Sequence, residues 1–339
     1  MISVIVPCHN ESGNIQKTYQ TITNQTLKTI QLYFVDDAST DTTYAEIQAL
    51  PQTKGITVHA LKTETNLYRA GACNLALKQV TTKYVVMMDA GTTLEKHALE
   101  HAIKTLESNP NIGLVCSKAG IEKNGKGLLY RLQKLEYANT DLSRMITQNN
   151  VMISHGLFSA TRKEILEQVG YYSENMLLED YDLTVKVKQA GYLAVFSPQI
   201  QAYTETVKTV KQLIKQRYRW FLGGLDVLTK YGYSAETKED IFGHALYLTF
   251  FMAIMGTLIF GFTFNNFQIT YTNIMLIPIA LATINYVTSL IGLAFVENLT
   301  KKDVVIRATI LPELLYCIFL ELVRWKAYLA KCFTKKRKW

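Results

Sequence analysis

A long block without a single formally charged residue constrains this chain more than any other feature. No Asp, Glu, Lys or Arg occurs from Ile241 to Val296. A helical membrane span needs about 20 apolar residues, so the block has room for two. It divides into 242–264 and 274–295, with the polar but uncharged connector 265–273 between them. We therefore expect two transmembrane helices within residues 242–296, rather than a pair of buried helices in a soluble protein.

The remaining charge is unevenly distributed along the chain. The net charge is +8, from 36 Lys and Arg against 28 Asp and Glu, but residues 331–339 alone hold five of the positive side chains. Lys and Arg also flank the uncharged block, whereas the connector has none, so the positive-inside bias places both flanks in the cytoplasm. The basic excess thus reports membrane orientation, and a nucleic-acid partner is not expected.

Three further segments adjoin the block. Residues 226–241 are expected to form an amphipathic connector, and 331–339 a basic cytoplasmic tail at the anionic membrane surface. The apolar stretch within 304–330 contains acidic residues and precedes the tail. We interpret it as an interfacial helix lying on membrane lipids, with a third span as the alternative.

The chain opens on a strand pattern rather than a signal peptide. Its five cysteines are odd in number and show no metal-type spacing, which suits a reducing compartment. We therefore expect residues 1–225 to be a cytosolic domain attached to the cell membrane.

Within this domain, short β-branched runs alternate with helical patterns. Strands are predicted at 2–6, 31–35, 55–61 and 84–88, and helices at 12–24, 40–49, 70–80 and 95–107; later come strands at 154–161 and 193–196 and a helix at 207–222. Such alternation predicts an α/β fold with a parallel, doubly wound sheet. Ligands of these sheets bind beyond the carboxyl ends of the strands, where this chain places His9, Glu11, Asp37 and Asp89.

Acidic residues at strand ends indicate a divalent cation shared with a phosphate ligand, because Mg²⁺ and Mn²⁺ prefer oxygen donors. A second acidic pair, Glu179 and Asp180, stands at a predicted helix start, where capping explains only one carboxylate. The segment 216–220 adds two arginines, which suit a diphosphate, and a tryptophan. A tryptophan beside a membrane block is also a common interfacial anchor.

Five segments, taken in order, carry a family resemblance. They are Val4-Ile5-Val6-Pro7-Cys8-His9-Asn10-Glu11, Val35-Asp36-Asp37-Ala38-Ser39-Thr40-Asp41, Met88-Asp89-Ala90-Gly91-Thr92, Glu179-Asp180-Tyr181-Asp182-Leu183 and Gln216-Arg217-Tyr218-Arg219-Trp220. Together they resemble the family 2 glycosyltransferases, and more narrowly the membrane-bound, inverting, processive branch that makes cellulose, chitin, hyaluronan and poly-N-acetylglucosamine. The resemblance covers about residues 1–225 and implies a GT-A type nucleotide-sugar-binding domain.

The resemblance also implies roles at matching positions. The donor would be a UDP-sugar, with Asp37 accepting the uracil N3 proton and the loop around His9 and Glu11 against the base. Arg69 matches a basic position near the nucleotide, and Asp89 matches the ligand of Mg²⁺ or Mn²⁺. Asp180 matches the general base, with Glu179 beside it. Four residues would bind the substrates: Gln216, Arg217 and Arg219 would contact the diphosphate, and Trp220 would stack on the acceptor sugar.

Two features depart from that branch. Its metal motif usually ends in a second Asp, where this chain has Gly91. The resulting form, Asp-x-Gly-Thr, resembles the version of the motif found in chitin synthases. Processive synthases also generally carry more membrane helices than two. The short C-terminal anchor instead resembles polyprenyl-phosphate glycosyltransferases, which lack the Gln-x-x-Arg-Trp segment.

Three functions follow as hypotheses. The first is an inverting transferase that extends a β-linked polysaccharide from UDP-glucose or UDP-N-acetylglucosamine at the cytoplasmic membrane face. The second is transfer of one sugar to a lipid-linked acceptor, and the third is an inactive subunit of a synthase complex. Two spans are too few to form a polymer channel within one chain, so a homo-oligomer or a separate export partner is expected.

Overall fold

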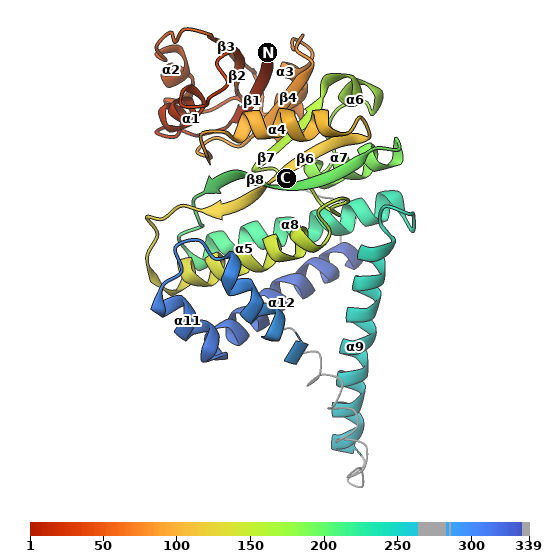
Figure 1. Cartoon of the computed structure of the whole chain (residues 1–339). Helices are drawn as coiled ribbons and strands as arrows, with labels where there is room; N and C mark the ends of the chain where they lie inside the picture. The colour runs from red at the N-terminus through yellow and green to blue at the C-terminus, as the bar shows by residue number, and fades with distance from the viewer. Residues whose placement is uncertain (264–282, 285, 334–339) are drawn as a thin grey trace.

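The computed structural model describes residues 1–263, 283–284 and 286–333, and its centre is one β-sheet (Figure 1). The sheet has eight strands in the order β3-β2-β1-β4-β7-β6-β8-β5. The strands are β1 (Ile2–Cys8), β2 (Ile30–Asp36), β3 (Ile56–Lys62), β4 (Tyr84–Met88), β5 (Thr93–Leu94), β6 (Ile112–Ile121), β7 (Phe158–Arg162) and β8 (Leu193–Thr204). β3, β2, β1 and β4 are mutually parallel, as are β6 and β8, whereas β7 runs antiparallel to both β4 and β6. The predicted α/β fold with a mostly parallel sheet is confirmed.

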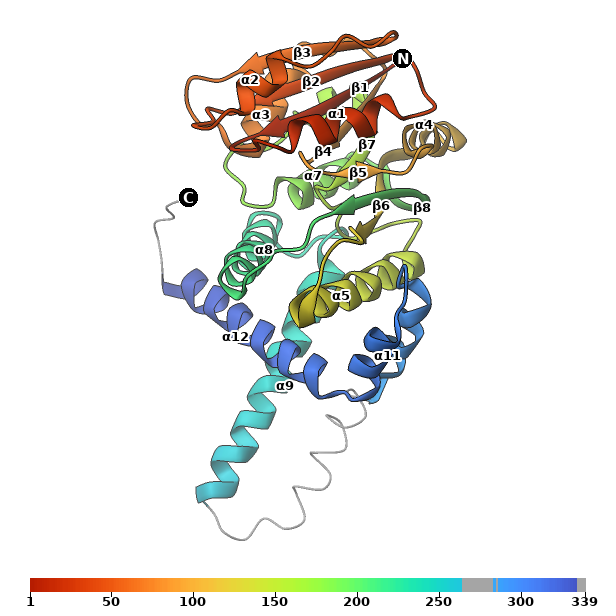
Figure 2. The ribbon, with the colours of Figure 1, turned by 90° about the vertical axis from the view of Figure 1, so that its left-hand side faces the viewer.

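Helices cover both faces of the sheet (Figures 1 and 2). Successive side chains of a strand point to opposite faces, so Val4 and Ile5 of β1 belong to different apolar clusters. The cluster on the Val4 side includes residues of α1 (Ile15–Thr23), α2 (Thr43–Gln48) and α4 (Ala98–Ser108). The cluster on the Ile5 side includes residues of α3 (Tyr68–Leu77), α6 (Lys163–Gln168) and α7 (Glu179–Gln189).

A second group of helices packs beyond the β6–β8 end of the sheet (Figure 2). It comprises α5 (Gly127–Ile146), α8 (Val210–Tyr231), α11 (Lys301–Ala308) and α12 (Leu311–Phe333). Leu132 of α5, Leu213 of α8 and Tyr316 of α12 are buried against one another. The buried Asp303 of α11 pairs with Arg131 and Lys134 of α5 at 2.6 and 3.0 Å. The segment after the uncharged block therefore packs back onto the amino-terminal domain. We call this group the helical layer.

The helical layer is also where the sequence-based elements and the structure differ most. β6 and α5 were not among the predicted elements. The helix predicted at 207–222 corresponds to α8. It begins at Val210, after a capping box between Thr209 and Gln212, and it continues to Tyr231. After Tyr231 the chain turns at Gly232, and α9 (Lys238–Thr263) follows.

The uncharged block is only partly described. The first predicted span, 242–264, falls on α9, which extends away from the rest of the molecule (Figures 1 and 2). In residues 1–263, 283–284 and 286–333, we find no helix with the length and apolar character needed to cross a membrane. The predicted C-terminal transmembrane helices are therefore not confirmed, nor is the alternative of a third span at 304–330. Residues 274–282 and 285 of the second predicted span, 274–295, lie outside the described residues.

Candidate active site

The loops after the first four strands of the parallel sheet share an unusual backbone conformation. Asn10, Ala38, Tyr68 and Gly91 all have positive φ values, of 57°, 54°, 58° and 77°. For a residue with a side chain this conformation costs on the order of 1–3 kcal/mol and persists only where the surroundings enforce it. Here the amide of Asn10 donates to Ser39 Oγ at 2.9 Å, so the first two loops hold each other. The sharp turns direct polar groups to one edge of the sheet.

Asp37 is fixed at this edge by bonds to a single carboxylate oxygen. Thr63 Oγ1 and the amide of Leu67 donate to Asp37 Oδ1 at 3.0 and 2.7 Å. Asp37 is only 3% exposed, and His9 Nδ1 donates to its carbonyl oxygen at 2.7 Å. Because both donors use Oδ1, the other oxygen is available to accept from a ligand. The structure thus brings together His9 and Asp37, the two residues predicted to bind the uracil base.

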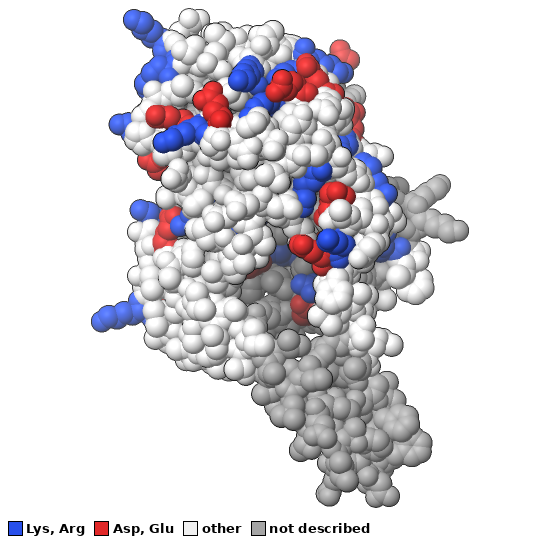
Figure 3. All heavy atoms as spheres, turned by 45° about the vertical axis from the view of Figure 1, so that its right-hand side comes forward, with Lys and Arg blue, Asp and Glu red and all other residues white. Residues whose placement is uncertain are grey.

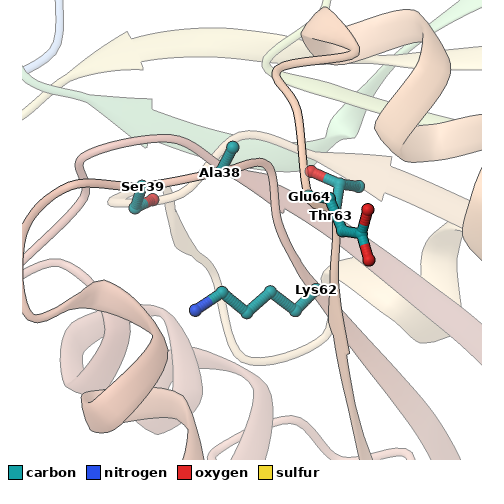
Figure 4. Close-up of a pocket in the computed structure, with 5 residues that line it drawn as sticks. All are labelled: Ala38, Ser39, Lys62, Thr63 and Glu64. Atoms are coloured by element: carbon teal, nitrogen blue, oxygen red, sulfur yellow. The ribbon is translucent and has the colours of Figure 1, made fainter.

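A cavity of about 410 Å³ lies beside Asp37. It is lined by Ala38, Ser39, Lys62, Thr63 and Glu64 (Figure 4). Lys62 extends beneath the loop of Ala38 and Ser39, and its Nζ lies 4.7 Å from the centre of the Tyr44 ring. Thr63, which holds Asp37, connects this cavity to the buried carboxylate.

Arg69 joins three parts of the site. Its Nε donates to Asp89 Oδ1 at 2.8 Å, one terminal nitrogen to Glu179 Oε1 at 2.7 Å, and the other to the carbonyl of Gly156 at 2.7 Å. These partners lie at the end of β4, at the start of α7 and in the loop before β7. The predicted metal ligand and the predicted catalytic segment are therefore linked through one guanidinium group.

Asp180 lies in the first turn of α7, and its Oδ1 accepts the amide of Tyr181 at 2.8 Å. Burial and, next, the negative charge of Glu179 raise the pKa of Asp180 to about 6, although the positive charge of Arg69 opposes the rise. A carboxylate with a pKa in this range is suited to accept a proton near neutral pH.

Gly156 separates Arg69 from Asp180. A Cβ atom added at Gly156 would lie 3.2 Å from the guanidinium carbon of Arg69 and 3.3 Å from Asp180 Oδ2. The single sequence contains no signal for this role, because an isolated glycine before a strand has many explanations. The missing side chain keeps open the space between the two charged groups.

Replacing Gly156 by Ala is expected to lower kcat by about tenfold, because a displacement of the reacting groups by a fraction of an ångström weakens a proton transfer that depends on geometry. Steady-state kinetics at saturating substrate measure the effect. Gly243→Ala is the matched control, since nothing lies within 4 Å of a Cβ built there. Equal activity of both variants would show that Gly156 is not at the reacting centre.

The residues of the 216–220 segment divide between two surroundings. Gln216 and Gly223 are seven residues apart, two turns along one face of α8, and a Cβ at Gly223 would lie 2.6 Å from Leu178 Cγ and 3.0 Å from Leu177 Cβ. Leu177 and Leu178 immediately precede the Glu179-Asp180 pair. The Gln216 face of α8 is therefore the face that packs beside the catalytic segment.

Arg217 does not lie where it could bind the diphosphate of a substrate. It is 2% exposed, and it pairs with Glu136 of α5 at 2.8 Å. Arg219 is exposed, and Trp220 is half-buried with the Arg217 guanidinium 4.1 Å from its ring centre. Within the described residues, neither Arg217 nor Arg219 forms a hydrogen bond or ion pair with Asp89 or Asp180.

Glu11 lies on the same edge but makes local contacts. It accepts a hydrogen bond from Asn14 Nδ2 at 2.7 Å, and burial raises its pKa. A Cβ at Gly91 would lie 3.2 Å from the Asn14 side chain, and Gly91 has a positive φ of 77°. The loop conformation and the Asn14 side chain therefore favour glycine at position 91 over a second carboxylate.

The donor groups around Asp89 suit a cation held mainly by a phosphate ligand. Asp89 has 47% of its side chain exposed, and Arg69 uses only one of its oxygens. No cluster of three or more His, Cys, Asp or Glu side chains that could hold a metal occurs in the described part of the chain. One carboxylate together with substrate phosphates and water is a usual set for Mg²⁺. The residues present thus fit a divalent ion that binds together with its substrate.

Acidic and basic side chains are interspersed on the face shown in Figure 3, over the sheet and along the helical layer. This distribution contrasts with a single-sign patch.

Comparisons with known proteins agree with this geometry. Residues 3–170 match the family model for Glycosyl transferase family 2. The chain is 28% identical over 257 residues to a poly-beta-1,6-N-acetyl-D-glucosamine synthase of Staphylococcus epidermidis, covering 75% of this chain and 61% of the relative. It is 27% identical over 263 residues to the synthase of the same name in Staphylococcus aureus, covering 76% and 62%. The chain thus spans less than two thirds of the length of these relatives.

A solved structure shares the fold across nearly the whole chain. It is a mannosyltransferase from Pyrobaculum calidifontis in complex with GDP-Man and Mn²⁺, with a TM-score of 0.63 and 18% identity, covering 99% of this chain and 88% of that one. At this identity the likeness shows the fold alone. The family match over residues 3–170, together with the synthase relatives, shows that the chain carries a family 2 glycosyltransferase domain and is an enzyme of the glycosyltransferase class.

Proposed function

We propose that this enzyme transfers N-acetylglucosamine from a UDP-sugar to a growing β-linked polysaccharide, with inversion at the anomeric carbon. The observation that carries the proposal is the meeting of Asp37, Asp89 and Asp180 at one edge of the sheet, with Arg69 linking the last two segments. The relatives named poly-beta-1,6-N-acetyl-D-glucosamine synthases support the choice of sugar and the formation of a polymer.

Each residue then has a chemical task. Asp37 accepts the N3–H of uracil beside the cavity of Figure 4. Asp180 removes the proton of the acceptor hydroxyl as its oxygen attacks the anomeric carbon, and the bond to the diphosphate oxygen breaks. One displacement with one base inverts the configuration. UDP leaves with the electron pair of the broken bond. Arg69 bonds to Asp89, which is proposed to lie at the diphosphate, so its positive charge is near the negative charge that develops on the departing UDP.

Asp89 would hold the divalent ion, which when bound would neutralise charge on the diphosphate. The Mn²⁺ in the mannosyltransferase complex supports metal dependence but does not select the ion. Gln216 and Trp220, on the face of α8 beside the catalytic segment, are proposed to contact the diphosphate and the acceptor sugar.

Product sizing tests this function. Purified full-length chain is supplied with UDP-N-acetylglucosamine, UDP-glucose or GDP-mannose and with Mg²⁺ or Mn²⁺, and nucleotide release and product length are measured. A ladder of β-linked oligomers from UDP-N-acetylglucosamine is the expected result. A single addition would replace the proposal by the non-processive alternative, and no turnover with any donor would favour an inactive subunit.

We also propose that the reaction occurs at the cytoplasmic face of a membrane. The support is the uncharged block Ile241–Val296 and an apolar row on α12. The row consists of Leu311, Leu314, Leu315, Ile318, Leu322, Leu329 and Phe333, each at least 49% exposed. Spacings of three and four residues place such side chains on one helical face, and the basic 331–339 segment would add attraction to anionic lipids.

Membrane binding by this row is tested with lipid vesicles. The double variant Leu315→Glu and Leu322→Glu is expected to weaken co-flotation with vesicles of phosphatidylcholine and phosphatidylglycerol, because two apolar side chains leave the lipid and two negative charges face it. The matched control is Lys28→Glu plus Lys54→Glu, on the opposite end of the molecule near β2 and β3. Equal flotation of both double variants would contradict the proposed lipid-facing role of α12.

A further inference from the structure

Arg217 is buried in the helical layer and contacts other side chains of the 216–220 segment. Its Nε donates to Glu136 Oε1 at 3.2 Å and its terminal nitrogen to Glu136 Oε2 at 2.8 Å. The other terminal nitrogen donates to Gln216 Oε1 at 2.6 Å, and the guanidinium carbon lies 4.1 Å from the Trp220 ring centre. One buried arginine thus contacts two side chains that are proposed to touch substrate.

The partner of Arg217 is itself held by the C-terminal helix. Tyr316 of α12 donates its hydroxyl to Glu136 Oε2 at 2.6 Å. Burial and the Glu136 carboxylate raise the pKa of Tyr316, so the phenol stays protonated and remains a donor. Tyr316 is buried together with Leu132 and Leu213, and an apolar environment on one side of a hydrogen bond strengthens it.

The contacts form a continuous path from α12 through α5 to α8. Tyr316 lies after the uncharged block, Glu136 precedes the catalytic segment, and Gln216 and Trp220 lie on α8. Gly223, on the same face as Gln216, contacts Leu177 and Leu178 directly before the general base. A shift of the Arg217 side chain would therefore move groups that lie beside the reacting centre.

We propose that Glu136 and Tyr316 are positioning residues for substrate binding on α8, acting through Arg217 on Gln216 at the diphosphate and on Trp220 at the acceptor sugar. The identity of the substrates in this inference rests on the proposed function. The path of contacts does not depend on it. It assigns a task to the segment after the uncharged block: α12 sets the geometry of the acceptor-binding face from the opposite side of α8. Neither residue touches substrate.

Two substitutions that preserve shape test the path. Tyr316→Phe removes one hydroxyl, and Glu136→Gln removes the charge of the shared acceptor. UDP release by the full chain is measured over a range of β-linked N-acetylglucosamine oligomers and, separately, of UDP-N-acetylglucosamine. We expect kcat/KM for the acceptor to fall by about tenfold, since each variant weakens a charge-assisted hydrogen bond of the path. We expect the donor KM to rise as well, because Arg217 also holds Gln216, which is proposed to contact the diphosphate.

Lys331→Met is the matched control. Lys331 of α12 pairs with the buried Asp226 of α8 at 2.9 Å, so the variant loosens the same two helices without touching Arg217. It is expected to lower the Tm but to leave the acceptor KM unchanged. If Tyr316→Phe and Glu136→Gln also lower only the Tm, their role is structural and the inference is overturned.

Fluorescence separates a failure of the inference from a failure of the proposed function. The chain has three tryptophans, so the emission of Trp220 is obtained by subtracting the spectrum of Trp220→Phe in each background. The Trp220 emission is expected to change in Tyr316→Phe and Glu136→Gln and to stay constant in Lys331→Met. This readout needs no substrate, so it holds even where the wild-type chain turns over none of the donors. Unchanged emission in both variants would overturn the inference.

Discussion

Replacing Asp180 by Asn is expected to lower kcat by about a thousandfold while leaving donor affinity nearly intact. The amide keeps the shape of the side chain and can still accept the Tyr181 amide, but it cannot take a proton from the acceptor hydroxyl. A positioned general base contributes about 10²–10⁴-fold to the rate. Steady-state turnover and UDP binding by calorimetry measure the two effects separately.

The pH dependence gives an independent signature of the same group. Because burial and Glu179 raise the pKa of Asp180 to about 6, the wild-type rate is expected to fall as the pH drops through about 6, where the base becomes protonated. The residual activity of Asp180→Asn should lack this acidic limb. An acidic limb of equal position in both proteins would assign it to another group.

Asp182→Asn provides the matched control, two residues along the same helix. Asp182 is fully buried, and it accepts from Lys230 Nζ at 2.5 Å and from the Tyr231 hydroxyl at 2.9 Å. Loss of that charge is expected to lower the Tm, because the buried side chain at position 182 loses its ion pair with Lys230, without removing the acidic limb. A thousandfold loss in both variants would show that α7 has a structural role only.

The positions of Asp37 and Asp89 could be predicted because the sheet geometry determines them. Alternating strand and helix patterns require parallel strands, and the carboxyl ends of parallel strands meet at one edge. The structure places both residues there, each directly after the strand that the pattern indicated. The Glu179-Asp180 pair depended instead on the family resemblance, since sequence position alone could not bring α7 beside β4.

The surroundings of the 216–220 segment could not be predicted, for a physical reason. Adjacent residues of a helix point about 100° apart, so Gln216 and Arg217 face different neighbours even though they belong to one motif. Which face meets the site depends on α5 and α12, and α5 was not recognised in the sequence. Gly156 was missed because its contribution is the absence of a side chain between Arg69 and Asp180.

Replacing Arg69 by Met is expected to lower both stability and activity. Removal of the guanidinium leaves Glu179, whose side chain is 11% exposed, without the Arg69 contact and releases Asp89. Breaking a largely buried ion pair at one partner costs roughly 3 kcal/mol, which thermal or urea unfolding measures. Turnover of the folded enzyme is expected to fall by about a hundredfold, because Asp89 loses its link through Arg69 to Glu179, the neighbour of the general base.

The pH profile decides whether Arg69 acts on the chemistry or only on the fold. Arg69 opposes the burial and the Glu179 charge that raise the pKa of Asp180, so its removal should move the acidic limb of the rate to higher pH. Arg131→Met is the matched control: Arg131 pairs with the buried Asp303 at 2.6 Å in the helical layer. It should lower the Tm and leave the limb in place. An unmoved limb in Arg69→Met would reduce Arg69 to a structural bridge, whereas an upward shift would show that the link between Asp89 and Glu179 also sets the pH at which the base is active.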